Sequence, residues 1–269
     1  EQKIRAADLS PLDPYLLPDH AHGELATWVT AKFDIQCKAG DFVDLEPEEA
    51  VDLVMTRAMD AYAVRERDYP IDFAIEMTGT LMQQDPDRAL KQFCHWVKVK
   101  YDLDWTPATL PSSNPADLKE FLLEEAKRWD DDRRMRRATQ VVEAGGDDIP
   151  AWLQEHWNVV LTEANHELLE SDPVGLVDTK IKEVQRAELT QLERSVLLQI
   201  FDATWKDHLY QMDQARESIG FRSFSQRDPR IEFKREGARL FDEMFQHVQD
   251  RVTDLVFRAR MSVRPRVPQ

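Results

Sequence analysis

The stretch 174–219 constrains the fold of this chain more than any other part of the sequence. It contains no proline, and its one glycine, Gly175, lies near its start. It can therefore run as one helix of roughly 45 residues, about 65 to 70 Å long at the α-helical rise. Asp228 and Pro229 follow soon afterwards, and this pair suits the N-cap and the first position of a second helix. The sequence thus predicts two long helices joined by a short polar segment.

Apolar residues recur at intervals of three and four in both predicted helices, which places them on one face of each. In the first helix they are Leu197, Phe201, Trp205, Leu209, Met212, Ala215 and Ile219. In the second they are Phe233, Leu240, Phe241, Met244, Phe245, Val248, Val252, Leu255 and Val256. Adjacent apolar pairs such as Leu240 and Phe241 make the second face wide, so we expect it to have room for a further neighbour.

The rest of the chain also favours helices. Glycine occurs only 8 times, while Ala, Leu, Glu, Arg, Lys and Gln are frequent, which leaves few places for hairpin turns. Proline or glycine interrupts the helical periodicity at several points. We therefore predict an all-α protein with helices near residues 47–67, 71–83, 86–100, 115–143, 151–170, 174–219 and 229–260.

A segment of the first half recurs after 68 residues. The eight residues from Trp28 to Ile35 return as those from Trp96 to Leu103, and the register continues from Pro47 to Pro115. Each copy ends a helix at an aromatic-Asp-aliphatic exit and restarts one at a proline, whose missing N–H is harmless at that position. Asn114 is a good N-cap for the second copy, and Glu46 is a poorer one for the first. We interpret the pattern as two copies of one helical unit, about 25–67 and 93–135. Chance similarity between two helical segments is the alternative, and two copies are too few for a solenoid.

The net charge of −16 is unevenly distributed. Residues 196–269 carry 13 basic and 11 acidic side chains, whereas residues 1–195 carry 22 basic and 40 acidic ones. Phosphate groups would be repelled by the first part, so we expect no nucleic-acid partner. No stretch approaches the roughly 20 apolar residues that a membrane span needs. The chain begins without methionine or an apolar leader, and we expect it to be a piece of a larger protein without a signal peptide.

The common catalytic motifs do not occur. The sequence has no phosphate-binding loop, no dinucleotide-binding glycine motif, no nucleophile elbow and no zinc-protease helix motif. We expect no catalytic residue and no ATP hydrolysis by this chain. The acidic-then-basic run 130–137 is interpreted as ion pairing on a helix surface, with a docking role as the alternative.

Several residues are candidates for metal ligands. Glu163 and His166 have the spacing of a di-iron carboxylate bundle, but such a site needs a second motif and further glutamates. His20 and His22 lack a third ligand nearby. Cys37 and Cys94 are far apart in sequence, without further ligands at metal-binding spacing, and we expect neither a disulfide nor a zinc site. No metal or other cofactor is therefore expected, and a di-metal bundle enzyme is the least favoured class.

The segment between the two long helices is the candidate binding site. An aromatic ring at the end of a long hairpin has little protein to bury it, so Phe224 would need a partner. Arg222, Gln226 and Arg227 offer donors that can bind backbone carbonyls of an extended chain irrespective of its sequence. In the alternative, Phe221 and Phe224 fold back as a local cap on the two helices. His208, one turn from Trp205, is interpreted as a packing or hydrogen-bonding histidine, because no nucleophile accompanies it.

At these residues the sequence resembles the SecA preprotein translocase motors, specifically their helical scaffold. The resemblance is carried by Leu197 to Leu209, by Met212, Asp213 and Arg216, by the segment Phe221 to Pro229, and by Glu232 to Glu236. Residues 1–195 resemble the helical wing of that family more weakly, chiefly at Lys32 to Ile35 and Lys100 to Leu103.

The resemblance implies that residues 196–260 form a two-helix finger that reaches toward the SecY channel and contacts an unfolded preprotein. Phe221, Arg222, Ser223, Phe224, Gln226 and Arg227 would contact the polypeptide. Trp205, His208, Met212, Asp228 and Pro229 would support the finger. Phe224 stands where the family usually has tyrosine, which preserves a ring contact but loses a phenolic hydrogen bond.

The resemblance also implies a division of the chain and a location. We expect a helical wing at 1–173, a scaffold helix with the finger at 174–262, and a tail at 263–269. ATP and Mg²⁺ would belong to motor domains of the parent protein that this chain lacks, and the parent would sit in the cytoplasm at the inner membrane. A non-enzymatic adaptor that binds a partner helix is the alternative. The wide apolar face of the second helix also predicts a homodimer of the isolated chain.

Overall fold

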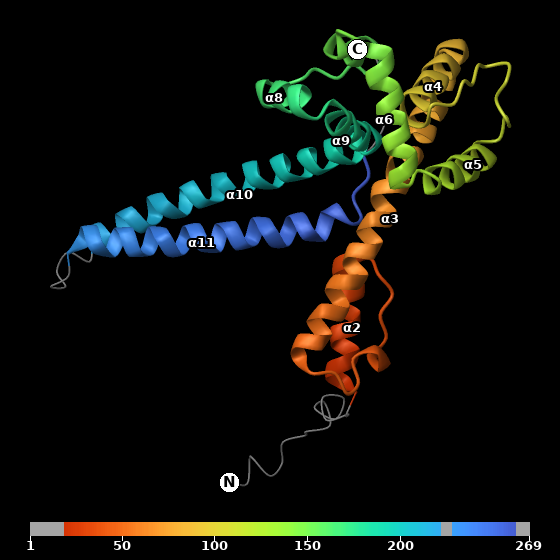
Figure 1. Cartoon of the computed structure of the whole chain (residues 1–269). Coiled ribbons are helices and arrows are strands. Elements are labelled where there is room, and N and C mark those ends of the chain that lie inside the picture. The colour runs from red at the N-terminus through yellow and green to blue at the C-terminus, as the bar shows by residue number, and fades with distance from the viewer. Residues whose placement is uncertain (1–18, 222–227, 262–269) are drawn as a thin grey trace. The chain divides into compact units, whose positions relative to one another are not determined.

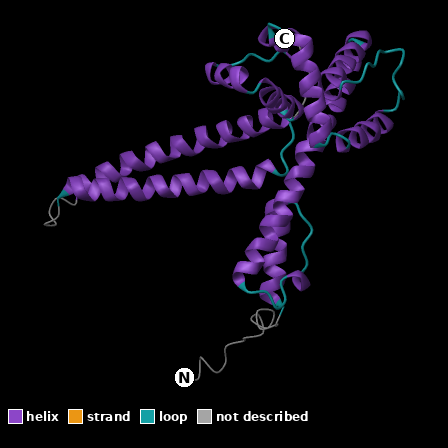
Figure 2. Ribbon diagram, in the orientation of Figure 1, coloured by secondary structure: helices purple, strands orange, loops and turns teal. Residues whose placement is uncertain are grey.

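The computed structural model describes residues 19–221 and 228–261, and over these ranges it contains helices and loops but no strand (Figure 2). The all-α prediction is therefore confirmed for this part of the chain. In chain order the α-helices are α2 (His20–Phe33), α3 (Pro47–Met82), α4 (Pro86–Tyr101), α5 (Pro115–Lys127), α6 (Asp131–Gly145), α7 (Ile149–Trp157), α8 (Glu163–Ser171), α9 (Pro173–Gln185), α10 (Ala187–Phe221) and α11 (Pro229–Val256). A short 3-10 helix, η2 (Ala39–Asp41), lies between α2 and α3.

The described residues form two compact units. Residues 19–62 and 192–260 make up the first, and residues 63–191 with residue 261 make up the second. Because α3 and α10 cross these limits, each helix contributes residues to both units. The boundary between wing and scaffold at residue 173 stays a prediction.

The first unit combines α2, η2, the first part of α3, most of α10 and all of α11. Its small core lies where α2 and η2 pack against α3, and its buried members are Ala26, Val29, Ile35, Phe42 and Val54. The helix α2 also packs against α11. The C-terminal half of the chain therefore contributes to the same unit as the N-terminal helix.

The second unit has two apolar cores. One lies between the second part of α3 and the helices α4 and α5, around Ile71, Phe93, Val97, Tyr101 and Leu122. The other joins α6, α7 and α9 around Val141, Leu153, Trp157, Val177 and Ile181. Because α9 also packs against α4 and α8, it holds the helices of this unit together.

A break predicted at Pro70 is absent, because α3 continues through it as one helix of 36 residues. Proline inside a helix removes one backbone hydrogen bond and normally interrupts the helix. Here Tyr69, Pro70 and Ile71 are all buried. Tertiary packing around this turn therefore outweighs the local cost of the proline.

Three helices predicted to be continuous are broken. The long helix predicted at 174–219 is divided at Arg186, which separates α9 from α10. The helix predicted at 115–143 is divided before Asp130, whose carboxylate caps α6 by accepting a hydrogen bond from the backbone N–H of Arg133 at 2.8 Å. The helix predicted at 151–170 ends at Trp157, where Asn158 adopts a left-handed conformation with φ of 55°. Side-chain caps and left-handed residues satisfy the backbone at a helix end and so compete with continuation of the helix. The helices therefore end at these points although the flanking residues favour helix.

The two copies of the 68-residue repeat share their helix ends. Phe33 ends α2 and Tyr101 ends α4, and the following Asp34 and Asp102 are both left-handed, with φ of 55° and 57°. Pro47 and Pro115 then begin the next helices, as the repeat predicts. Asn114, the predicted cap of the second copy, accepts a hydrogen bond from the backbone N–H of Ala116. That the copies are a duplicated wing unit is still a prediction.

Candidate functional site

The candidate site is the hairpin that α11 forms with residues 192–221 of α10. The two helices run side by side in opposite directions, and Figure 1 shows the end of α10 and the start of α11 at the same end of this hairpin. The contributing part of α10 is about 45 Å long and α11 about 42 Å at the helical rise. These lengths place the end of α10 and the start of α11 well away from the base of the hairpin.

The inner faces of the hairpin are built by apolar residues at three- and four-residue spacing. Those buried are Leu192, Val196, Ile200, Ala215 and Ile219 on α10, and Leu240, Met244 and Val248 on α11. The apolar stripe predicted for α10 is therefore correct at Ala215 and Ile219. Near the start of α10 it is wrong by one residue, because Val196 and Ile200 are buried there and Leu197 and Phe201 are exposed. In the α11 pairs Leu240–Phe241 and Met244–Phe245, the first residue is buried and the second is exposed.

A second, outer row of apolar side chains remains uncovered within the described part of the chain. Its members are Leu197, Phe201, Trp205 and Leu209 on α10, and Phe241 and Phe245 on α11, each 37 to 49% exposed. Aromatic rings connect the two helices. Phe201 stacks on Trp205 at 6.0 Å, Trp205 lies 5.4 Å from His208, and His208 contacts the edge of Phe241 at 6.0 Å between centroids.

His208 packs in the hairpin as predicted. It is 6% exposed, and its Nδ1 has no hydrogen-bond partner among the described residues. No nucleophile is paired with it among the hydrogen bonds of the described residues. Its surroundings are those of a ring that fills space between two helices.

Met212 and Gly237 meet where the helices approach each other. A Cβ atom on Gly237 would lie 3.1 Å from Met212 Cε and 3.5 Å from its sulfur. The missing side chain therefore leaves the room that the Met212 thioether occupies. Sequence periodicity alone did not indicate this contact, since glycine inside a helix gives no apolar signal.

The start of α11 is as the sequence predicts. Asp228 is the N-cap, its carboxylate accepts a hydrogen bond from the backbone N–H of Arg230 at 2.9 Å, and Pro229 occupies the first turn. Of the residues predicted to contact a polypeptide, Phe221 is the last residue of α10. Arg222, Ser223, Phe224, Gln226 and Arg227 lie outside the described residues.

The base of the hairpin is held by the first repeat copy. The Lys32 amine at the end of α2 donates to the backbone carbonyl of Asp250 at 3.2 Å and forms an ion pair with Asp254 at 3.0 Å, both on α11. The edge of Phe33 contacts Phe257 at 5.4 Å. Tyr62 of α3 donates a hydrogen bond to Glu193 of α10. These contacts tie both hairpin helices to the N-terminal helices of the same unit.

Lys100 occupies the junction between α9 and α10 in the second unit. Its amine is 3% exposed and donates to the carbonyls of Val184 at 2.6 Å and Gln185 at 3.0 Å. It also forms an ion pair with Glu188. Helix C-termini leave carbonyls without intrahelical partners and favour a cation, so Lys100 stabilises the end of α9. Burial lowers the pKa of the Lys100 amine, and the Glu188 carboxylate opposes this change.

The sequence did not reveal the structural role of Lys100, although it contained a signal for it. Lys32 and Lys100 occupy the same position of the two repeat copies. Each lies in the last turn of its helix and binds the backbone of a helix more than 80 residues later in the chain. The repeated segment thus contains the residue that attaches each copy to the C-terminal half.

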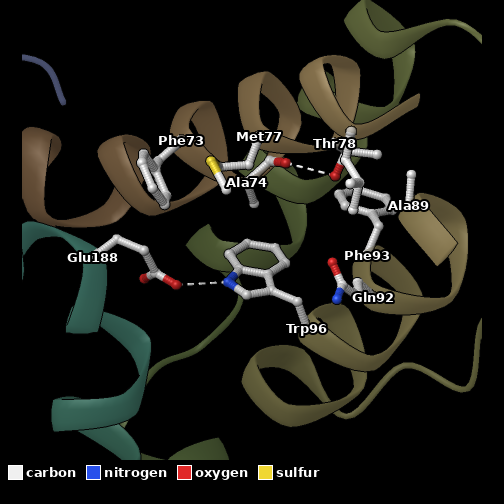
Figure 3. A pocket seen from close by; sticks show the side chains of 10 residues that line it. Phe73, Ala74, Met77, Thr78, Ala89, Gln92, Phe93, Trp96 and Glu188 are labelled. Atoms are coloured by element: carbon white, nitrogen blue, oxygen red, sulfur yellow. Dashed lines mark hydrogen bonds between the residues drawn. The ribbon is translucent and has the colours of Figure 1, made fainter. Parts of the chain in front are cut away.

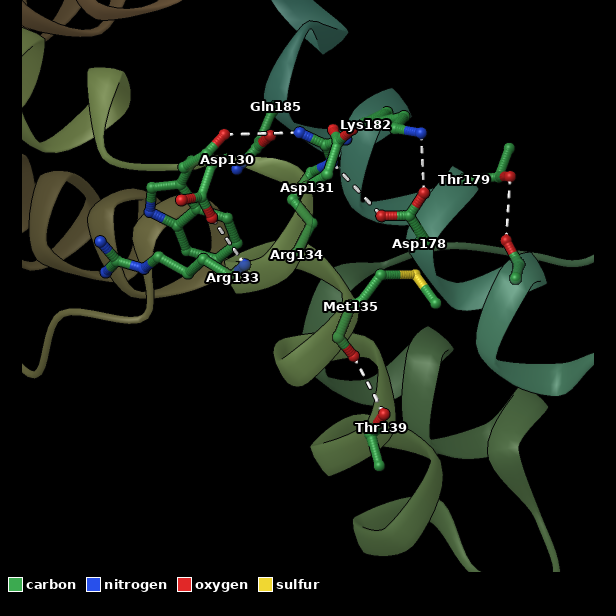
Figure 4. Close-up of polar contacts among 12 residues, drawn as sticks. Asp130, Asp131, Arg133, Arg134, Met135, Thr139, Asp178, Thr179, Lys182 and Gln185 are labelled. Atoms are coloured by element: carbon green, nitrogen blue, oxygen red, sulfur yellow. Dashed lines mark hydrogen bonds and ion pairs between the residues drawn. The ribbon is translucent and has the colours of Figure 1, made fainter.

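The basic part of the run 130–137 connects helices, and is not confined to pairing on its own surface. Three ion pairs do so: Arg133 with Glu125 of α5, Arg134 with Asp178 of α9, and Arg137 with Asp102 at the end of α4. In Figure 4 the Arg134 guanidinium and Lys182 both approach the Asp178 carboxylate. Since these arginines are occupied within the second unit, the run is structural.

The second unit also has an apolar cavity of about 190 Å³ between α3 and α4 (Figure 3). Phe73, Met77, Phe93 and Trp96 are among the residues that line it. At its edge the indole N–H of Trp96 donates to the Glu188 carboxylate at 2.7 Å. The cavity holds one ionisable group, Glu188, and that group already binds Trp96 and Lys100. It therefore offers space but no catalytic pair.

Other candidate residues are not brought together. Cys37 and Cys94 are free thiols. Across residues 19–221 and 228–261, no cluster of three or more His, Cys, Asp or Glu side chains is placed to hold a metal ion. Within the same ranges, no helix combines the length and the apolar character needed to cross a bilayer.

Comparison with known proteins supports the resemblance. The family model described as "SecA Wing and Scaffold domain" matches residues 81–260. The chain is 29% identical to "Protein translocase subunit SecA 1" of Rhodopirellula baltica over 284 residues, which cover 96% of this chain and 22% of that protein. It is 38% identical to "Protein translocase subunit SecA" of Cutibacterium acnes over 97 residues, covering 36% of this chain and 11% of that protein.

The same name, "Protein translocase subunit SecA", is given to a relative from Endomicrobium trichonymphae, 38% identical over 76 residues. These residues cover 28% of this chain and 9% of that protein. No solved structure matches the chain. The chain spans about a fifth or less of the length of these relatives. Because the family model matches about two thirds of its residues, the chain belongs to the SecA wing and scaffold family.

Proposed function

We propose that this chain is the wing and scaffold part of a protein translocase subunit, and that its α10–α11 hairpin transmits movement to a polypeptide at its tip. The observation that carries the proposal is the construction of the hairpin. The two long helices meet at His208 and Phe241 and at Met212 and Gly237, and residues of α2 and α3 hold the base. Close-packed helices resist bending, so a movement at the base of the hairpin would be transmitted to its other end, where α10 ends and α11 begins.

The residues between α10 and α11 have side chains suited to contact with a polypeptide. Phe224 supplies a ring, and Arg222, Gln226 and Arg227 supply donors for backbone carbonyls, with Phe221 and Ser223 beside them. Carbonyls occur in every polypeptide, so such donors would engage an unfolded preprotein with little regard to its sequence. Asp228 and Pro229 fix the start of α11 next to these residues.

The energy would come from outside this chain. It has no phosphate-binding loop, so ATP and Mg²⁺ would be bound by motor domains elsewhere in the parent protein. The membrane partner would be a SecY-type channel, and the parent would act in the cytoplasm at the surface of the inner membrane. Both assignments rest on membership of the SecA family.

Crosslinking in the full-length parent protein tests the hairpin assignment. A photoreactive amino acid at position 224 should crosslink to a stalled preprotein, and the same probe at Tyr210, an exposed residue on the stem of α10, should do so much less. Phe224→Ala should reduce translocation. Absence of a crosslink at 224, together with full translocation by Phe224→Ala, would defeat the assignment.

The outer apolar row favours a second candidate, an adaptor that binds a partner helix. Leu197, Phe201 and Trp205 form a row on one helix, and Phe241 and Phe245 extend it onto the other. A face of this kind normally needs a neighbour. The neighbour would be another part of the parent protein or, in the isolated chain, a second copy.

Light scattering of the isolated chain distinguishes these neighbours. If the isolated chain dimerises and the substitutions Phe201→Glu and Phe245→Glu abolish the dimer, the outer row binds a second copy of the chain. A strict monomer at high concentration would exclude the homodimer and leave the row to the parent protein. A parent sequence without a phosphate-binding loop would favour the adaptor over the translocase.

A further inference from the structure

An uncovered apolar row on the first part of α3 is separate from the hairpin. Val51, Met55 and Met59 are 60, 51 and 66% exposed. They are spaced four residues apart, so they lie along one face of the helix. We call these three residues the methionine row. They precede residues 81–260, which match the family model.

The second repeat copy shows that the fold does not require apolar residues at these positions. The residues 68 positions later are Lys119, Leu123 and Lys127 of α5. The two lysine side chains are 43% and 51% exposed, and Leu123 packs against the apolar core of the second unit. One copy therefore has solvated charges at the two outward positions, whereas the other has Val51 and Met59.

An acidic row accompanies the methionine row. Glu48, Asp52 and Asp60 are exposed, and they lie on the adjacent four-residue row of α3. Glu48 and Asp52 each stand three residues before a member of the methionine row, which makes them neighbours on the helix surface. Among the residues that the structure describes, no cation forms an ion pair with these three carboxylates. In the second copy the corresponding residues are Ala116, Glu120 and Arg128, so only one of the three carboxylates recurs there.

These features select the chemistry of the partner. Unbranched methionine side chains adapt to apolar surfaces of different shapes, which suits partners that vary in sequence. Unpaired carboxylates beside them favour positive charge and repel negative charge. We propose that the methionine row with its acidic neighbours binds a polypeptide segment that is both apolar and positively charged.

A second copy of the chain is a poor occupant. Residues 1–195 carry 40 acidic and 22 basic side chains, so two such surfaces would repel each other. Three side chains also form a small patch beside the roughly 800 Å² that each partner of a stable complex commonly buries. A short segment with complementary charge fits both the size and the sign of this surface.

The proposal does not rest on the hairpin function, because α3 would bind the segment whether or not the tip contacts a polypeptide. The test is fluorescence anisotropy with the whole chain and a labelled synthetic helix-forming peptide of Leu and Ala that carries several lysines. A matched peptide has glutamate in place of each lysine. The lysine peptide should bind, more weakly as salt is raised, and the glutamate peptide should not.

Two variants locate the binding surface. Val51→Lys combined with Met59→Lys introduces the residues of the second copy and should weaken binding about tenfold, the change that loss of a few buried methylene groups would bring. Met135→Lys, at a 45% exposed methionine of α6, is the matched control and should bind as the unaltered chain does. Asp52→Asn with Asp60→Asn should weaken binding and flatten its salt dependence. Circular dichroism should show unchanged helix content in every variant, since all of these positions are exposed.

Several outcomes would overturn the proposal. These are equal binding of the lysine and glutamate peptides, unchanged binding by the double lysine variant, and absence of binding by the unaltered chain. Binding that appears only after removal of residues 1–18 would assign the surface to that segment of the chain itself. Self-association that the double lysine variant abolishes would assign it to a second copy.

Discussion

Lys32 and Lys100 stand at the same position of two repeat copies, and each donates to the backbone of a helix more than 80 residues later in the chain. Lys32 binds the carbonyl of Asp250 in α11, and Lys100 binds the carbonyls of Val184 and Gln185 at the end of α9. The two lysines differ in their partners' exposure. Asp250 and Asp254 are 76% and 42% exposed, whereas Glu188 beside Lys100 is 14% exposed.

Lys100→Met should destabilise the protein strongly. It leaves the largely buried Glu188 carboxylate, 14% exposed, without its cation, and loss of one partner of a buried pair typically costs about 3 to 5 kcal/mol. We expect the lower end of this range, because Glu188 keeps its hydrogen bond from Trp96. Urea denaturation measures the effect on the free energy of unfolding. Adding Glu188→Gln to Lys100→Met should recover part of the loss, since the unpaired charge is removed.

Lys32→Met should have a smaller effect than Lys100→Met. Ion pairs with exposed partners contribute about 0 to 1 kcal/mol, because water screens them. Lys98→Met is the control on α4, as its side chain is 42% exposed and its partners are surface carboxylates. If Lys32→Met and Lys100→Met lowered the free energy of unfolding equally, the difference in burial of their carboxylate partners would not matter for stability.

Gly237 offers a test of the hairpin interior. Gly237→Ala should raise the free energy of unfolding by up to about 1 kcal/mol, because glycine is a poor helix former. The flexible end of Met212 can move away from the new methyl group, whose nearest contact is 3.1 Å. Gly237→Leu should instead destabilise the hairpin by about 1 to 3 kcal/mol through overpacking. Thermal unfolding of both variants measures the sign of each change, and destabilisation by alanine would show that Met212 is held rigidly.

Asp228→Ala should destabilise the start of α11 by about 1 kcal/mol. The carboxylate accepts the backbone N–H of Arg230, and its removal leaves that donor without its cap. Hydrogen exchange should show faster exchange in the first turn of α11 and little change near Met244. Asp228→Asn, which can still cap the helix, should behave almost as the unaltered chain does. If asparagine were as harmful as alanine, the cap would not be the cause.

Asp41 should titrate below its usual range. The Arg57 guanidinium at 2.6 Å and the backbone N–H of Lys38 at 3.1 Å hold the pKa of its carboxyl below 3.8. Because the pKa is lower in the folded state, the stabilisation is present above about pH 3.8 and is lost as pH falls through the folded pKa. Carboxyl NMR titration measures it. Arg57→Gln should move the Asp41 pKa back up, and an unchanged titration would exclude the pairing.

Local sequence patterns determined the helical class and several helix ends. Scarce glycine and frequent helix formers predict an all-α chain, and Pro47, Pro86, Pro115 and Pro229 each begin a helix as first-turn prolines do. The caps at Asn114 and Asp228 were predicted for the same reason, since a cap depends on atoms only a few residues away. The residues proposed to contact a polypeptide could be named from their chemistry alone.

Tertiary structure decided what local patterns could not. Pro70 is accommodated because its neighbours are buried, and the helix break at Arg186 is stabilised because Lys100, far away in sequence, binds the released carbonyls. Near the start of α10 the buried residues differ by one position from the predicted stripe, because adjacent apolar pairs leave the periodicity ambiguous. Sequence spacing reports neighbours within a helix. Which of two apolar residues faces inward, and which lysine is buried, depends on a partner helix that contacts them only after folding.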